Sequence, residues 1–102
     1  MLSEYRNKID EIDDKISKLL NERLEVSKKI GEEKAKSDKV VLDKGREKDV
    51  LNKVTANVAP EYKLYVKQIY ESIFETSKAY QRQFIHRNSA ISTKIENALN
   101  EG

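Results

Sequence analysis

The sequence has few of the residues on which most enzyme chemistry depends. Its 102 residues include no cysteine, one proline, three glycines and one histidine. The absence of cysteine excludes disulfides, thiolate chemistry and cysteine-based metal sites, and it permits a reducing compartment without proving one. His86 alone cannot complete a metal cluster or a serine–histidine–aspartate arrangement. Gly31, Gly45 and Gly102 are too far apart to form a glycine-rich phosphate loop, so we expect no metal and no other cofactor.

Long apolar runs and large patches of one charge are missing as well. No window approaches the eighteen or so apolar residues of a membrane span, and the first residues, MLSEYRNKID, contain no apolar signal-peptide core. Lys and Arg number 20 against 18 Asp and Glu, and the two signs alternate along the chain. Because a nucleic-acid binder concentrates basic residues in a stripe, we expect no nucleic-acid partner. Because no membrane span and no signal-peptide core are found, we expect no membrane partner and a cytoplasmic location.

Charged residues make up 37% of the chain, and with so little glycine and proline this predicts an all-α protein of long, solvent-coated helices. No proline interrupts the stretch from Ser3 to about Lys36, which we predict to be one helix. Apolar residues recur there in steps of three and four, the spacing of a single helical face, and the resulting seam consists of Tyr5, Ile9, Ile12, Ile16, Leu19, Val26 and Ile30, with Arg23 among them.

Two further helices are expected. Ser37–Leu42 is predicted to be a loop, and Asp43 is placed as the N-cap of a short second helix that includes Val58. Pro60 suits the start of a third helix that runs from Glu61 to roughly Ile85. Residues 1–85 are therefore predicted to form one helical domain, and residues 86–102 a polar tail, either a short helix or a frayed end.

The length of the first helix predicts a dimer. A helix of some 33 residues is about 50 Å long, whereas a compact chain of about 100 residues has a radius of gyration of about 13 Å. An apolar seam along the whole helix needs a partner along the whole helix, so we expect an intertwined homodimer. A solitary three-helix bundle with a broken first helix is the alternative.

Arg23 is the most unusual residue of the seam. Three of its four neighbours at three and four residues, Leu19, Leu20 and Val26, are apolar, and a buried guanidinium needs a carboxylate or a cavity. Alternatively, Arg23 extends out of the seam or specifies coiled-coil register. Lys34 lies about 16 Å further along nearly the same face, so the two cations could hold one small dianion between them. Alternatively, Glu32 and Glu33 neutralise Lys34.

Other polar residues have both structural and functional interpretations. Asp43 and Glu47 suit the first turn of the second helix, whereas Arg46 is unfavourable there unless it meets a carboxylate or an anionic ligand. In the third helix Ser77 and Gln81 share a stripe with Tyr70 and Phe74. An amide on such a stripe often only bonds to a neighbouring helix.

In order along the chain, these residues resemble the all-helical AroQ class of chorismate mutases. The resemblance covers Leu2 to Phe84, most of the chain. Its motifs are Arg6 in YRNKIDEID, Arg23 in LLNER, Gly31 and Lys34 in IGEEK, Asp43, Arg46 and Glu47 as D-x-x-R-E, and Ser77 and Gln81 as S-x-x-x-Q. Gly45 departs from the pattern, since it is a poor helix former near the start of a helix.

The resemblance implies a homodimer with two sites that rearrange chorismate to prephenate, a step toward phenylalanine and tyrosine. It implies that Arg23, Lys34, Gln81 and Glu47 act in catalysis, and that Arg6, Arg46, Asp43 and Ser77 contact the substrate. Arg6 and Arg23 are about 25 Å apart along one helix, so Arg6 should enter the site from the other subunit.

Two other functions remain open at this stage. An isochorismate pyruvate-lyase uses the same helical scaffold and much the same cationic pocket. A non-catalytic regulatory or dimerisation module could also have kept the fold.

Overall fold

A computed structural model describes the backbone of residues 1–36 and 44–101, and the side chains of residues 1–36 and 45–84. The described chain forms three α-helices, α1 (Leu2–Lys36), α2 (Lys44–Ala56) and α3 (Lys63–Glu101), and a short 3-10 helix, η1 (Pro60–Tyr62). No strand occurs in this part of the chain, so the all-α prediction is confirmed. The predicted loop Ser37–Leu42 and the N-cap residue Asp43 lie outside the described residues.

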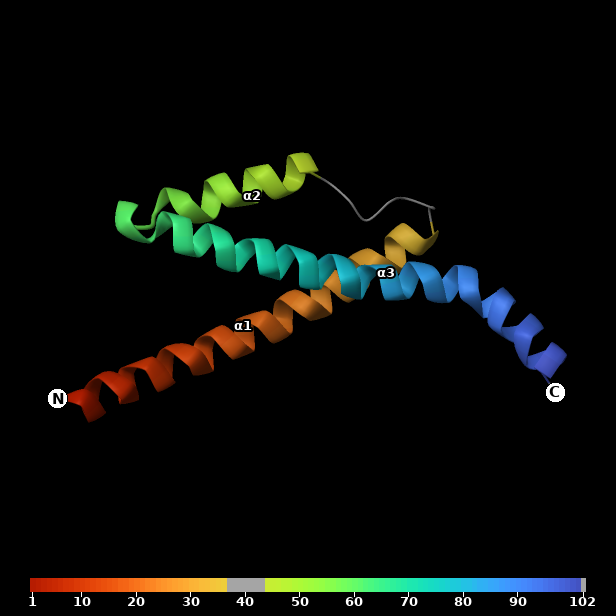
Figure 1. Ribbon diagram of the computed structural model, residues 1–102, viewed down its shortest axis with the longest axis horizontal. Coiled ribbons are helices and arrows are strands. Elements are labelled where there is room, and N and C mark those ends of the chain that lie inside the picture. Colours follow the sequence, from red (N-terminus) through yellow and green to blue (C-terminus); the bar gives the residue numbers. More distant parts are fainter. Residues whose placement is uncertain (37–43, 102) are drawn as a thin grey trace.

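The helices form an open, elongated arrangement. The C-terminal part of α1 crosses the middle of α3, while the N-terminal half of α1 diverges from it, and α2 runs beside the first half of α3 (Figure 1). The chain measures 63 × 33 × 18 Å, and its radius of gyration is 18.7 Å. Because a compact chain of this size has a radius of about 13 Å, a large part of the helical surface has no cover within one chain.

Small residues allow α1 and α3 to approach closely where they cross. Ser27 and Gly31, one turn apart on α1, are both buried. A Cβ atom on Gly31 would lie 3.2 Å from the Cα and 3.3 Å from the carbonyl oxygen of Gln81, which are backbone atoms of α3. This close approach of two backbones favours glycine at position 31, because a larger residue would push α1 and α3 apart by a few tenths of an ångström.

The apolar seam of α1 is uncovered along its N-terminal half. Tyr5 is 66% exposed, Ile9 is 55% exposed and Leu19 is 62% exposed, and this half of the helix extends away from α3 (Figure 1). On α3 Leu64, Tyr65 and Ile69 are also exposed. Such a contiguous apolar surface is typical of a protein interface.

The second and third helices differ in extent from the sequence-based prediction. Helix α2 ends at Ala56, so Val58 lies in the turn that follows it. Extended backbone at Ala59, with φ −54° and ψ 140°, precedes Pro60, which opens η1. Helix α3 then continues to Glu101, beyond the predicted end near Ile85, because neither glycine nor proline interrupts residues 61–101. None of the helices, over the residues described, is long and apolar enough to cross a membrane.

Candidate active site

A cleft of about 400 Å³ lies between the three helices. This volume is within the range of small-molecule sites. Each helix contributes several side chains, and the lining consists of Arg23, Val26, Ser27, Ile30 and Lys34 from α1, Arg46, Glu47 and Val50 from α2, and Phe74, Ser77, Lys78 and Gln81 from α3.

The cleft collects most of the residues that the sequence singled out. Six of the eight predicted site residues line it, namely Arg23, Lys34, Arg46, Glu47, Ser77 and Gln81. Arg6 lies on the exposed, diverging half of α1 and does not line the cleft of its own chain. Asp43 lies outside the described residues.

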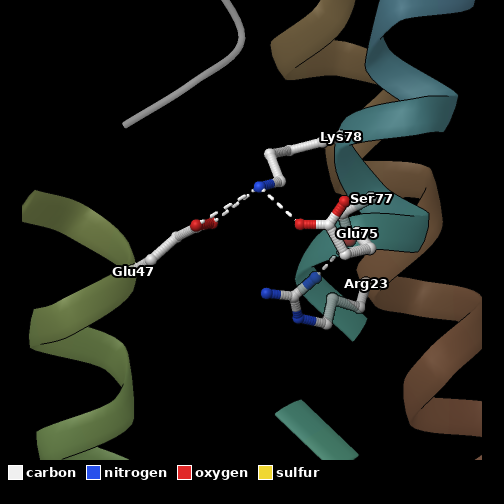
Figure 2. A network of polar contacts seen from close by, with 5 residues as sticks. All are labelled: Arg23, Glu47, Glu75, Ser77 and Lys78. Atoms are coloured by element: carbon white, nitrogen blue, oxygen red, sulfur yellow. Dashed lines mark hydrogen bonds and ion pairs between the residues drawn. The ribbon is translucent and has the colours of Figure 1, made fainter. Parts of the chain in front are cut away.

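Arg23 is held by neutral groups. Its Nη1 atom donates a hydrogen bond to Ser77 Oγ at 2.5 Å (Figure 2). Its guanidinium carbon lies 6.0 Å from the centre of the Phe74 ring. Ser77 and Phe74 are buried on the stripe of α3 that also contains Gln81. Among the described residues no carboxylate pairs with Arg23. The structure therefore favours a cavity rather than an internal ion pair, and the orientation of the guanidinium is fixed before a ligand arrives.

Glu47 of α2 meets Lys78 of α3 across the cleft (Figure 2). Lys78 Nζ donates a hydrogen bond of 3.4 Å to Glu47 Oε1 and lies 3.3 Å from Oε2. The same nitrogen lies 2.8 Å from Glu75 Oε1, one turn earlier on α3. The Lys78 side chain is 13% exposed and that of Glu47 is 24% exposed, whereas Glu75 is largely in solvent. Lys78 is thus a cation shared between an inner and an outer carboxylate.

These contacts change the proton affinities of the pair on α3. The hydrogen bond to Glu75 raises the pKa of Lys78, and the contact with Glu47 adds to that effect. The hydrogen bond from Lys78 lowers the pKa of Glu75. Lys78 therefore stays protonated throughout the physiological pH range.

Two buried oxygen atoms in the cleft have no hydrogen-bond partner among the described residues. They are Glu47 Oε2, which lies near Lys78 Nζ without hydrogen-bond geometry, and Gln81 Oε1. Buried polar atoms are normally satisfied, and exceptions cluster at sites that bind a ligand or water. Glu47 therefore offers an acceptor to a ligand hydroxyl.

The electrostatic character of the cleft is strongly positive. Its lining contains the four cations Arg23, Lys34, Arg46 and Lys78 and the single carboxylate of Glu47, a net charge of +3. Val26, Ile30, Val50 and Phe74 provide apolar walls between them. Among the described residues no cluster of three His, Cys, Asp or Glu side chains could hold a metal ion. Such a cleft suits a small organic dianion with an apolar body.

Sequence reasoning missed Lys78 and Ser27. A lysine three residues after Glu75 reads as one half of a surface ion pair, and only the position of α2 shows that Lys78 also reaches Glu47. Ser27 carried a usable signal, because it lies four residues before Gly31 and two small residues one turn apart indicate a close helix crossing.

Comparison with known proteins agrees with this chemistry. Residues 5–82 match the family model described as chorismate mutase type II. The chain is 36% identical over 87 residues to the chorismate mutase of Methanocaldococcus jannaschii. The aligned region covers 82% of this chain and 87% of that protein. It is 34% identical over 86 residues to the bifunctional chorismate mutase/prephenate dehydratase of Buchnera aphidicola, and 42% identical over 53 residues to that of Aquifex aeolicus.

The extent of the matches differs between the relatives. The aligned region covers 81% of this chain for the Buchnera protein and 52% for the Aquifex protein, but the chain spans only 22% and 15% of their respective lengths. No solved structure matches the chain significantly. The family match covers most of the chain and contains all the described cleft residues, so the chain belongs to the chorismate mutase type II family.

Proposed function

We propose that this protein catalyses the rearrangement of chorismate to prephenate, as a homodimer and in the cytoplasm. The observation that carries the proposal is the charge of the cleft, where four cations face one carboxylate and Arg23 has no anionic partner in the described chain. Chorismate is a dianion with an apolar ring, an ether bridge and one hydroxyl. The family match and the three relatives support the same reaction, whereas none of these relatives is named as a pyruvate-lyase or as a non-catalytic module.

The proposed reaction needs no group that exchanges a proton or forms a covalent bond. The ether C–O bond breaks as a new C–C bond forms, within one cyclic movement of electrons. Catalysis then consists of holding the two arms of the substrate in a reactive conformer and stabilising the negative charge that grows on the ether oxygen.

Each lining residue has a role that fits its position. Arg23, oriented by Ser77, binds one carboxylate, and Arg46 lies near the second. Lys34 and Gln81 donate to the ether oxygen. Glu47 accepts from the ring hydroxyl, which satisfies its buried Oε2 atom. Asp43 stays a predicted substrate contact.

We propose a homodimer for two reasons. One chain leaves an apolar surface exposed, and it does not bring Arg6 to the substrate. The exposed seam from Tyr5 to Leu19 would be covered by the α1 helix of a second chain. Arg6 projects from this seam region, about 25 Å along α1 from Arg23, and so cannot reach the same small molecule within one chain. We propose that Arg6 enters the cleft of the partner subunit and binds the second carboxylate.

Purified protein supplied with chorismate tests the function directly. We expect prephenate to form, and Arg23→Met to lower kcat/KM about a hundredfold, since a charged hydrogen-bonded pair in a site contributes up to about 3 kcal/mol. Arg82→Met is the matched control, because Arg82 is exposed on α3 and its loss changes the net charge equally. No prephenate from the folded wild-type protein, or an equal effect of the two variants, would contradict the proposal.

A further inference from the structure

Lys78 lines the cleft but has no role in the reaction proposed above. It is the fourth cation of the lining, its side chain is 13% exposed, and its Nζ atom lies within 3.5 Å of oxygen atoms from two carboxylates. Holding a long, charged side chain in this way costs conformational entropy and desolvation, and surface ion pairs seldom repay such a cost. The placement of Lys78 therefore calls for an explanation beyond stability alone.

Helix α2 is the part of the site with the weakest support. It packs against α3, and none of its described side chains is buried. Its half-buried residues, Glu47, Val50, Leu51, Val54 and Thr55, follow one helical face, and Glu47 is the charged member of that face. Since α2 also carries Arg46, any rotation or sliding of this helix would move two site residues together.

We propose that Lys78 is a positioning residue for the mutase reaction, which fixes Glu47 and with it the site-facing side of α2 against α3. The inference rests on the proposed function. Lys78 Nζ lies 3.4 Å from Oε1 and 3.3 Å from Oε2 of Glu47, so the ammonium group holds the whole carboxylate in one orientation against α3. A freely rotating carboxylate would not keep an acceptor in one place for the substrate hydroxyl.

Lys78 also offsets the charge of Glu47. A carboxylate in the cleft repels the dianionic substrate, and an ammonium group 3.3 Å away offsets that repulsion. Glu75, whose side chain is largely in solvent, lies 2.8 Å from the same ammonium and so holds the Lys78 side chain from its other side. Lys78 Nζ thus lies between the exposed carboxylate of Glu75 and the half-buried carboxylate of Glu47 (Figure 2).

A double-mutant cycle tests whether Lys78 acts through Glu47. Lys78→Met should lower kcat/KM about tenfold, the value of one hydrogen bond to a charged group, and Lys78→Arg should recover most of the loss. In a Glu47→Gln background the same Lys78→Met change should cost less than about twofold. Lys67→Met is the control, because Lys67 is exposed on α3 and its replacement removes the same charge. The inference is wrong if Lys78→Met lowers kcat/KM by the same factor with and without Glu47→Gln. It is also wrong if Lys78→Met lowers kcat/KM no more than Lys67→Met does.

Hydrogen exchange gives a readout that does not depend on activity. Backbone amides of α2 should exchange faster in Lys78→Met than in the wild-type protein, while amides of α1 near Gly31 should not change. If the exchange of the α2 amides is unchanged, Lys78 does not hold α2 against α3. If the methionine variant does not fold, Lys78→Gln, which is polar but removes the charge and shortens the side chain, allows the same comparison. Failure of the proposed function would instead appear as a wild-type protein that makes no prephenate, whatever the exchange of α2.

Discussion

The crossing of α1 and α3 at Gly31 sets the distance between Lys34 and Gln81, the two proposed donors to the ether oxygen. The substitution Gly31→Ala tests whether this close crossing positions the site. The added methyl group would lie 3.2 and 3.3 Å from two backbone atoms of Gln81 and 3.4 Å from Cδ2 of Phe84. Ordinary carbon contacts are about 3.5–4.0 Å, so α1 and α3 must separate by a few tenths of an ångström. Backbone atoms cannot relieve this contact by changing a rotamer.

Two opposing free energies decide the outcome. Alanine improves helix propensity by about 1 kcal/mol, and overpacking of a close contact costs about 1–3 kcal/mol. We expect a net loss of about 1 kcal/mol in the free energy of unfolding. Lys34 is one turn beyond Gly31, and Gln81 is the residue displaced, so both donors move with respect to the substrate. A misplacement of about 1 Å can cost a hundredfold in rate, and we therefore expect kcat to fall about threefold to tenfold.

Urea unfolding at one fixed chain concentration measures the stability, and saturating chorismate measures kcat. Gly45→Ala is the stability control, since Gly45 is an exposed residue of α2 and gains the same propensity. We expect this control to be stabilising. If Gly31→Ala is stabilising to the same extent and leaves kcat unchanged, the close crossing does not position the site.

Two further predictions concern pH. Gln81→Glu should keep activity at low pH and lose it toward neutrality, because the introduced carboxyl group can donate to the ether oxygen only when protonated; a pH-independent kcat in this variant would remove Gln81 from that role. Glu75→Gln should flatten the acid limb of the stability curve. Lys78 lowers the pKa of Glu75, so this stabilisation is present above the pKa of an unperturbed glutamate, about 4.3, and is lost as the pH falls through the lowered value. Urea midpoints between pH 3 and pH 6 would show it, and parallel curves for the two proteins would contradict it.

The sequence predicted most of the helices because their signals are local. An uninterrupted 3–4 spacing gave α1 nearly to the residue, and Pro60 marked the start of the segment that leads into α3. The end of α3 was misplaced because residues 86–101 have a weak apolar pattern. The absence of helix breakers was the stronger signal there.

The site was predicted where residues contradicted their surroundings. Arg23 on an apolar seam and Gln81 on an apolar stripe both line the cleft. Lys78 gave no such contradiction, since a lysine after Glu75 is ordinary on a helix surface, and its role depends on how α2 packs against α3. That packing is a tertiary property which helix periodicity does not contain.

The central claim is that two chains share each active site, and mixing two inactive variants tests it most directly. Arg6→Ala and Arg23→Ala chains are combined in equal amounts under conditions where subunits exchange, and prephenate formation from chorismate is followed. Half of the dimers are then mixed, and each mixed dimer has one site with both arginines, so we predict recovery of about a quarter of the wild-type activity. If exchange is demonstrated and no activity returns, Arg6 does not serve the partner's cleft.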